Sequence, residues 1–282
     1  MKLLSKFNVS AVLVTLIIMA IMTSLLSLKF TLMETDSQLV SWWTGWLLNF
    51  STELFGAFVT YILIDTIIGK REMAESESRE RREQQIIAVT ELKASTTREA
   101  RQLIIDKMKE LDLFHGAILQ NVNLEGADLQ GANLIAADLR GVNLVGANLN
   151  KADFTRANLQ NAVLMLSDLQ ESRLDYANLA EAQLIDANLY SASLIQTILE
   201  KANLQGARLT EANLQRVNLE RARLVAANLQ AANLRWAVLT GAKLLAVNLQ
   251  GADLFSAKFD THTVLPDGTQ WSPDTHLDKY TI

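Results

Sequence analysis

Residues 127–131 read Ala-Asp-Leu-Gln-Gly, and residues 202–206 read Ala-Asn-Leu-Gln-Gly. Around both copies every fifth residue is Leu or Phe, from Leu119 to Phe259, without a break in phase. Ala stands two residues before that position in 22 of its 29 occurrences, and Asn or Asp stands directly before it in 18. Self-similarity at a fixed period is the signature of repeat architectures, so this stretch decides the fold.

A period of five residues matches neither the 3.6-residue helical turn nor the continuous alternation of a long strand. It matches a short extended step, in which residues two apart share a face, followed by a two-residue corner. Four such sides close a square coil of about twenty residues, with Ala and Leu inside and Asn or Asp and the corner residues outside. Seven coils stacked ~4.8 Å apart predict a rod about 35 Å long.

With its repeated Ala-(Asp/Asn)-Leu-x-x motif, the stretch 117–259 resembles the pentapeptide-repeat family. The resemblance implies a mainly β fold, a right-handed quadrilateral β-helix, which we expect over residues 114–260. It leaves function open, because one fold hosts many functions. The following segment also resembles the closing segments of other members. We therefore expect residues 261–282 to cap the rod, with Leu265 and Trp271 covering its open apolar end.

Residues 1–69 carry two apolar segments that predict a transmembrane helical hairpin. The first, 9–28, is uncharged over the ~20 residues that a helix needs to cross a bilayer. Because Lys2 and Lys6 precede it, a secretory signal peptide is the alternative. A retained helix is favoured, since the run exceeds the usual length of such a signal and no Ala-x-Ala-like cleavage site follows.

The second apolar segment, 42–68, begins with a tryptophan cluster typical of a membrane interface: Trp42, Trp43 and Trp46. Basic residues flank both outer ends of the hairpin and are scarce in its loop, at about 29–41. The positive-inside rule therefore predicts that both termini and the repeats are cytoplasmic. The hairpin and the charged segment after it also resemble membrane-bound members of the family from oxygenic photosynthetic bacteria, which implies a bacterial plasma or thylakoid membrane.

Residues 70–113 form a charged linker without Pro or Gly, a composition that favours helix. The sequence Thr-Thr-Arg-Glu at 96–99 fits a capping box, which predicts one helix over about 70–94 and another from about 97. In the second helix an apolar face is predicted from Ile104, Met108 and Leu111. We expect this face to dock on the end of the rod and shield it, rather than to form a coiled coil, because no heptad run is sustained.

No motif in the chain predicts catalysis or a cofactor. There is no Cys, no Gly-rich phosphate loop, no nucleophile elbow and no zinc signature. His115, His262 and His276 have no metal-ligand spacing to one another. We therefore predict a protein that is not an enzyme and that holds neither metal nor cofactor.

The charge of the repeats argues against a DNA mimic that regulates a topoisomerase, a role of soluble members of the family. Residues 114–260 contain fourteen acidic and twelve basic side chains, which gives a net charge of −2. A mimic of DNA needs a dense surface of one sign. We rank this reading below the others and expect no nucleic-acid partner.

Outward residues twenty apart are expected to stack into columns. One column has five apolar members among seven: Val145, Met165, Ile185, Val225 and Leu245, with Glu125 and Gln205. A second column reads Arg156, Tyr176, Gln196, Arg216 and Trp236, in which Arg216 could stack on Trp236. We predict that the apolar column, with Arg216 and Trp236, is an interaction surface for a partner protein or a second copy. The alternative is that loops or the linker helices cover these faces.

Within the second apolar segment, Asn49, Glu53, Gly56 and Thr60 share one predicted helical face. An acidic residue within a membrane is costly and is by default a functional hint. The alternative is packing, in which protonated Glu53 hydrogen-bonds Thr23 or another protomer.

These observations predict a membrane-anchored, non-catalytic scaffold that displays a cytoplasmic β-solenoid to unidentified protein partners. The alternative function is an oligomeric membrane conduit or sensor that uses the polar face of the second helix.

Overall fold

The structure, a computed structural model, describes residues 18, 21–26, 28–29 and 38–282. It divides into two compact units, Met1–Arg79 and Glu80–Ile282. Most of the first predicted membrane segment lies outside the described residues. Those described within it are helical.

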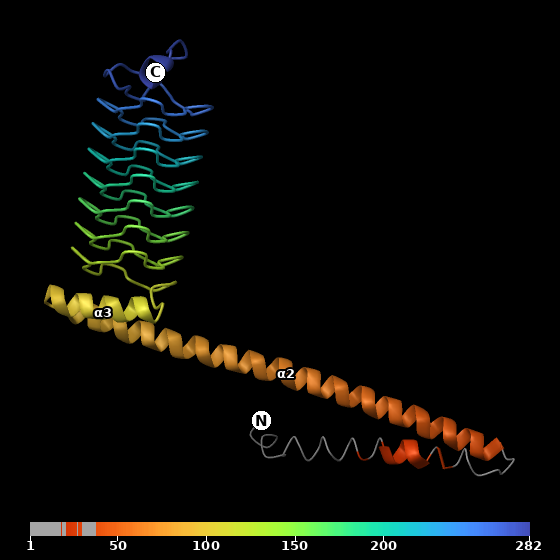
Figure 1. The fold of residues 1–282 in the computed structure, drawn as a ribbon. Helices are drawn as coiled ribbons and strands as arrows, with labels where there is room; N and C mark the ends of the chain where they lie inside the picture. Colours follow the sequence, from red (N-terminus) through yellow and green to blue (C-terminus); the bar gives the residue numbers. More distant parts are fainter. Residues whose placement is uncertain (1–17, 19–20, 27, 30–37) are drawn as a thin grey trace. The chain divides into compact units, whose positions relative to one another are not determined.

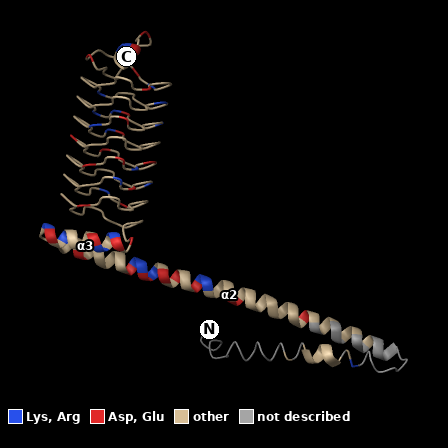
Figure 2. Ribbon diagram, viewed as in Figure 1, with Lys and Arg blue, Asp and Glu red and all other residues tan. Residues whose placement is uncertain are grey.

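The longest element is α2, Gln38–Ala94, a continuous helix of 57 residues. The sequence predicted a separate helix from about residue 70, but α2 continues through this point because no proline interrupts it. Its charged residues gather in the part nearer the C-terminal end (Figure 2). Within the described residues one helical segment, Thr52–Ala94, is long and apolar enough to cross a membrane.

Helix α3, Arg98–Glu110, begins at the N-cap Thr97, whose hydroxyl oxygen accepts the backbone N–H of Ala100 at 3.2 Å. The cap is therefore one residue later than the predicted capping box requires. Ile105 and Met108 are fully buried, and Ile104 is partly buried. Leu111, predicted to complete this face, is instead 43 % exposed, because the helix ends before it and its ψ of 5° turns the chain away.

The first coil of the rod is covered by helical side chains that replace the missing preceding coil. Gln102 of α3 donates from Nε2 to the carbonyl of Asp128 and accepts the N–H of Asp128 at 2.9 Å. Arg98 donates to the carbonyl of Gly126 at 2.9 Å. Ala88 and Leu92, near the end of α2, are buried in the same core. Residues near the end of α2 and on α3 thus lie against the first coil of the rod.

Residues from Ile118 onward form stacked four-sided coils (Figure 1). Parallel bridges join residues twenty apart, and the series that begins with Ile118 and Asp138 makes seven steps before it ends at Lys258. The prediction of a mainly β structure needs a correction, because among the described residues these are isolated bridges and no named strand occurs. A corner every five residues leaves each side too short for a longer ladder.

Each corner is a four-residue turn closed by a backbone hydrogen bond, as in Ala127 N–H to the carbonyl of Leu124 at 3.0 Å. The third residue of the turn has a positive φ, for example 55° at Ala136 and 61° at Arg156. Positive φ at this position is the requirement of a type II turn. Most of the residues that meet it here are not glycine, so the stacked hydrogen bonds hold a backbone conformation that L-residues otherwise avoid.

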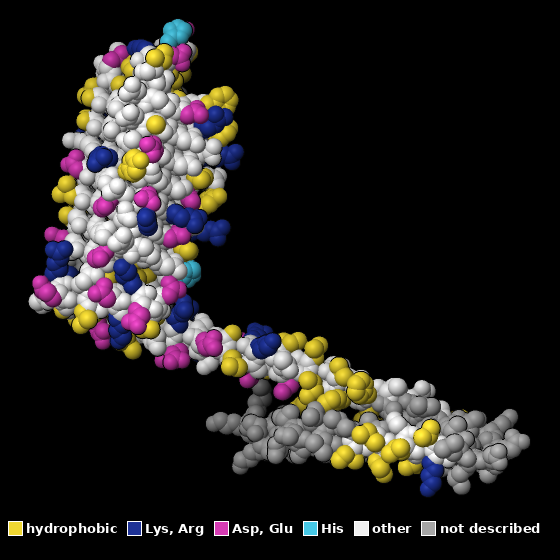
Figure 3. Space-filling view, in the orientation of Figure 1, with side chains coloured by type: hydrophobic (Ala, Val, Ile, Leu, Met, Phe, Trp, Pro, Cys, Tyr) yellow, Lys and Arg dark blue, Asp and Glu magenta, His cyan; other side chains and the backbone are white. Residues whose placement is uncertain are grey.

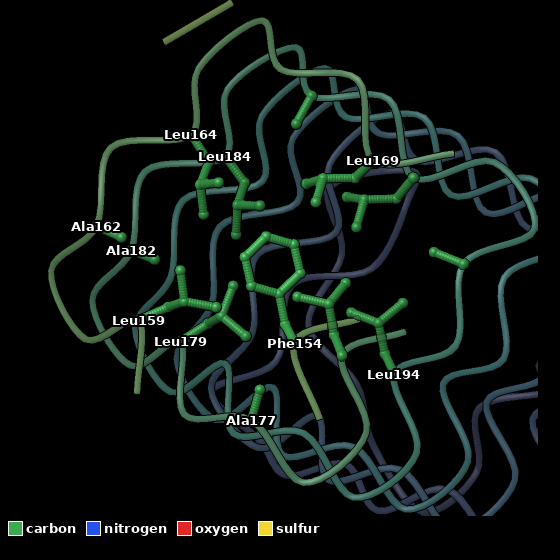
Figure 4. Close-up of a cluster of buried hydrophobic side chains, with 14 of the residues drawn as sticks. Phe154, Leu159, Ala162, Leu164, Leu169, Ala177, Leu179, Ala182, Leu184 and Leu194 are labelled. Carbon is green, nitrogen blue, oxygen red and sulfur yellow. The ribbon is translucent and has the colours of Figure 1, made fainter. Parts of the chain in front are cut away.

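The core is a stack of inward Leu side chains with Ala between them (Figure 4). Phe154 lies among these leucines and is fully buried. Leu159, Leu179 and Leu184 point toward the same interior from different sides and coils (Figure 4). This arrangement explains the predominance of Ala, because little space remains beside the facing Leu side chains.

The last coil contains one extra residue, since Lys243 bridges to Val264, 21 positions on, rather than to residue 263. The shift places Thr263 and Leu265 in the inward positions, and both are buried. Trp271 is half-buried and stacks on Phe259 with ring centroids 6.1 Å apart. Tyr280, in the short helix α4 (Asp278–Thr281), also packs against the core. Together these residues pack over the last coil of the rod.

Candidate binding surface

The Asn and Asp side chains of the repeat cap a backbone donor. At all 18 positions where Asn or Asp precedes the inward Leu or Phe, Oδ1 accepts the N–H of the residue two further on. Side-chain hydrogen bonds between coils also occur, as from Asn148 to Asp128 at 3.0 Å. The cap to the backbone is an Asx turn that we did not predict.

Eleven repeats lack Asn or Asp at this position, and two of them have a substitute acceptor. Asp175 accepts the N–H of Ile195, and the Thr263 hydroxyl accepts that of Asp260. In the described rod the other nine corner N–H groups have no protein acceptor. Four of the nine belong to the predicted apolar column, at Met165, Ile185, Val225 and Leu245. The column therefore combines apolar side chains with unused backbone donors.

The side chains of this column are less exposed than predicted. Val145, Met165, Ile185 and Val225 are half-buried, and Leu245 is 45 % exposed. Neighbours one coil away shelter each side chain, which the sequence pattern did not reveal. Leu166, beside Met165, is 63 % exposed and extends the apolar surface.

The second predicted column forms cation–π contacts. The guanidinium of Arg216 lies 5.4 Å from the ring centroid of Trp236, which confirms the predicted stacking. Arg235 lies 4.9 Å from the same ring and 4.5 Å from that of Phe255, although neither Arg235 nor Phe255 was predicted here. Arg235 and Phe255 are twenty residues apart in the sequence, and this spacing could have predicted that they lie on adjacent coils. Trp236 is 38 % exposed, so this cluster is open to a partner.

Charges of both signs are interspersed on the visible face of the rod (Figure 3). Ion pairs connect neighbouring coils, as between Lys151 and Glu171 at 3.5 Å and between Lys201 and Glu181 at 3.7 Å. Exposed pairs of this kind contribute little stability. They divide the surface into small alternating patches, unlike the continuous field of a nucleic acid.

A shallow groove of about 670 Å³ lies near the C-terminal end of the rod. Its floor is one wall of the rod and spans three coils. Arg223, Lys243 and Val264 lie on this wall and are joined by parallel β-bridges. Val225 and Leu245 of the apolar column also line it. The groove thus joins the predicted interaction column to a cationic wall.

On the opposite rim of the groove, the negative charges have partners within the protein. Asp260 accepts the N–H of Gly241 at 2.7 Å and contacts the hydroxyl of Thr263 and His262. The Gly241 N–H, followed by the Thr263 and His262 hydrogen bonds, lowers the pKa of Asp260 to about 2. Glu220 lies 3.8 Å from Arg221. Arg223 and Lys243 form no ion pair within the described chain.

The polar residues Asn49 and Glu53 are exposed on α2. On the same helix the Thr60 hydroxyl donates to the carbonyl of Gly56 at 2.8 Å, so it bonds to its own helix. The predicted hydrogen bond from Glu53 to Thr23 stays a prediction. Among the described residues no group of three or more His, Asp or Glu side chains is placed to hold a metal.

The fold and its repeating corner define a four-sided solenoid. The sequence profile of pentapeptide repeats matches in eight copies whose ranges together cover residues 113–260, more than half of the chain. The chain therefore belongs to the pentapeptide-repeat family. None of the curated proteins matches it.

Solved structures of several pentapeptide-repeat proteins resemble it in part. One from the thylakoid lumen of Arabidopsis thaliana is 30 % identical over 36 % of this chain and 70 % of its own, with a TM-score of 0.35. One from Nostoc PCC 7120 is 34 % identical over 36 % and 80 %, with a TM-score of 0.28. The plasmid-mediated fluoroquinolone resistance protein QnrB1 is 19 % identical over 53 % and 84 %, with a TM-score of 0.41.

Proposed function

We propose that this protein is a membrane-anchored, non-catalytic scaffold whose rod binds other proteins along one corner. One observation carries the proposal, the apolar column with its unused donors. At Met165 and Ile185, on neighbouring coils, half-buried apolar side chains lie beside backbone N–H groups that lack a protein acceptor. Burial of the apolar side chains would stabilise a complex. A partner with hydrogen-bond acceptors would add to this by pairing with the unused backbone N–H groups.

The diagonally opposite corner of the rod supports the same role. Trp236, Arg216 and Arg235 form a cluster of the residue types that dominate the energetics of protein interfaces. Because these side chains already contact one another, little side-chain freedom is lost on binding. The rod is also held by hydrogen bonds between all successive coils, so it can present both corners without rearrangement.

The anchor is supported by the helical segment Thr52–Ala94, which contains a stretch long and apolar enough to cross a membrane. We propose that it pairs with the segment 9–28 as a hairpin with both ends in the cytoplasm. Lys70 and Arg71 follow the apolar part of α2 directly, as the positive-inside rule requires of a cytoplasmic end.

A conduit or sensor is the second candidate function, favoured by the exposed side chains of Asn49 and Glu53 on α2. Reconstitution of the full-length protein into vesicles distinguishes the two functions, because only a conduit predicts ion flux. In a scaffold Glu53→Gln leaves assembly intact, whereas in a conduit it changes the flux.

The scaffold is tested by affinity purification from native membranes of the full-length chain and of a chain without residues 114–282. The proposal expects partners that are retained by the full-length chain and lost with the rod. Equal partner sets from the two proteins would show that binding resides in the membrane segment.

A further inference from the structure

We propose that the groove near the C-terminal end of the rod binds an acidic peptide segment that also carries aliphatic side chains. This inference rests on the proposed function and names the chemistry of one partner. Its first basis is charge. Arg223 and Lys243 stand on adjacent coils where most repeats carry Asn or Asp, and neither forms an ion pair within the described chain. Both side chains are exposed.

The second basis is that two backbone N–H groups beside these cations lack an acceptor. Arg and Lys side chains have no acceptor atom, so they cannot cap the corner N–H two residues on, as Asn and Asp do elsewhere. The N–H groups of Val225 and Leu245 consequently have no acceptor in the described rod. Each cation therefore lies beside an unused backbone donor, and the pair recurs on the next coil. Carboxylate and carbonyl oxygens are the groups that satisfy both.

The third basis is the apolar lining, which favours a peptide over a compact anion. Val225, Leu245 and Val264 line the groove beside the cations. On the other rim, the carboxylates of Glu220 and Asp260 repel any dense negative charge. A small dianion bound at the cations would therefore also be repelled by the carboxylates of the other rim. A peptide can direct its carboxylates to Arg223 and Lys243 and its aliphatic side chains to the apolar lining.

Gly241 lines the groove and adds no side chain to its rim. Gly241 has a φ of +67°, and a Cβ at this position would lie 3.1 Å from Cγ of Arg221. A larger residue would push Arg221 aside and narrow the entrance. The absence of a side chain at this corner fits an extended ligand crossing the rim.

The experiment uses the full-length protein in phosphatidylcholine nanodiscs and a random heptapeptide phage library. We expect the selected peptides to be enriched in Asp or Glu together with Leu, Ile or Val. Affinity of the most enriched synthetic peptide, measured by fluorescence anisotropy, should fall about tenfold or more in Arg223→Glu/Lys243→Glu. The neutral pair Arg223→Gln/Lys243→Gln should give an intermediate loss.

The matched control is Arg208→Glu/Lys258→Glu, which places the same charge changes at the same repeat position on other walls. This control should bind the peptide as the unmodified chain does. The proposal is overturned if no peptide is selected, if the selected peptides lack acidic residues, or if both Glu pairs bind equally well. Met165 and Ile185 lie on other coils, so the proposed scaffold surface can fail or hold independently of this result.

Discussion

A carboxylate oxygen of Asp175 accepts the backbone N–H of Ile195, one coil further on, at 2.9 Å. The same oxygen accepts the hydroxyl of Ser193 at 2.6 Å. Ser193 occupies a position where most repeats have Asn or Asp, so the carboxylate from the neighbouring coil takes over the missing cap. Asp175 is 8 % exposed, and its role in this rod is structural.

Asp175→Ala should lower the free energy of unfolding by about 1–3 kcal/mol, because it leaves the Ile195 N–H and the Ser193 hydroxyl without their acceptor. Chemical denaturation monitored by circular dichroism measures the loss. Asp175→Asn is the control and should lose less, since its amide oxygen can still accept. Equal losses in the two variants would assign the effect to charge rather than to the hydrogen bonds.

Ser193→Asn should restore most of this loss in the Asp175→Ala background, because Oδ1 of the new Asn reaches the Ile195 N–H as in the regular repeat. The measurement is the same denaturation in a double-mutant cycle. Additive effects of the two substitutions would exclude the proposed exchange of caps.

Arg208→Asn should stabilise the rod, a rare effect for a single substitution. Arg208 is exposed and leaves the N–H of Thr210 without an acceptor, and an Asn side chain supplies one. We expect a gain of about 0.5–1 kcal/mol in the free energy of unfolding. Arg208→Gln controls for loss of the charge, because its longer side chain does not form the Asx turn. A similar gain in both variants would contradict the explanation.

Asp260 should make stability depend on pH in the acid range. Its folded-state pKa is lowered from 3.8 to about 2, so its contribution is fully present above pH ~4 and disappears as the pH falls toward 2. The melting temperature of the unmodified chain should therefore exceed that of Asp260→Asn by a constant amount near neutral pH, and the gap should close between pH ~4 and pH ~2. A gap that is independent of pH would mean that the carboxylate charge contributes nothing.

The orientation of the rod can be tested because the chain has no cysteine. Gln230 is exposed at a corner, so Gln230→Cys introduces one accessible thiol. A cytoplasmic rod predicts that a membrane-impermeant maleimide labels this thiol only after the cells are permeabilised. Labelling of intact spheroplasts would place the rod on the opposite side.

The five-residue phase predicted the stacked coils because one inward position of each repeat is always Leu or Phe and the other is always a smaller residue, most often Ala. It could not reveal the register change at Val264, where the bridge from Lys243 skips one residue. The motif is lost there, and side-chain bonds from Asp260 and Thr263 guide the chain instead.

Predictions outside the repeat depended on details that the pattern does not contain. The prediction that Leu111 belongs to the buried face of the second linker helix was wrong, because helical phase alone does not show where a helix ends. The buried Ile105 was not predicted. The stacking of Arg216 on Trp236 was predictable, since it needs only the twenty-residue register. The groove was not predictable, because its lining includes Val264, which follows the change of register.

If the apolar column binds partners, the double substitution Met165→Glu/Ile185→Glu should abolish that binding. Both side chains are half-buried on the surface of neighbouring coils, so the charges should disrupt an interface and leave the Leu core intact. We expect an unchanged circular dichroism spectrum, together with loss of the partners or of the oligomer recovered from native membranes. An unchanged oligomer size and an unchanged partner set would show that the column is not an interface.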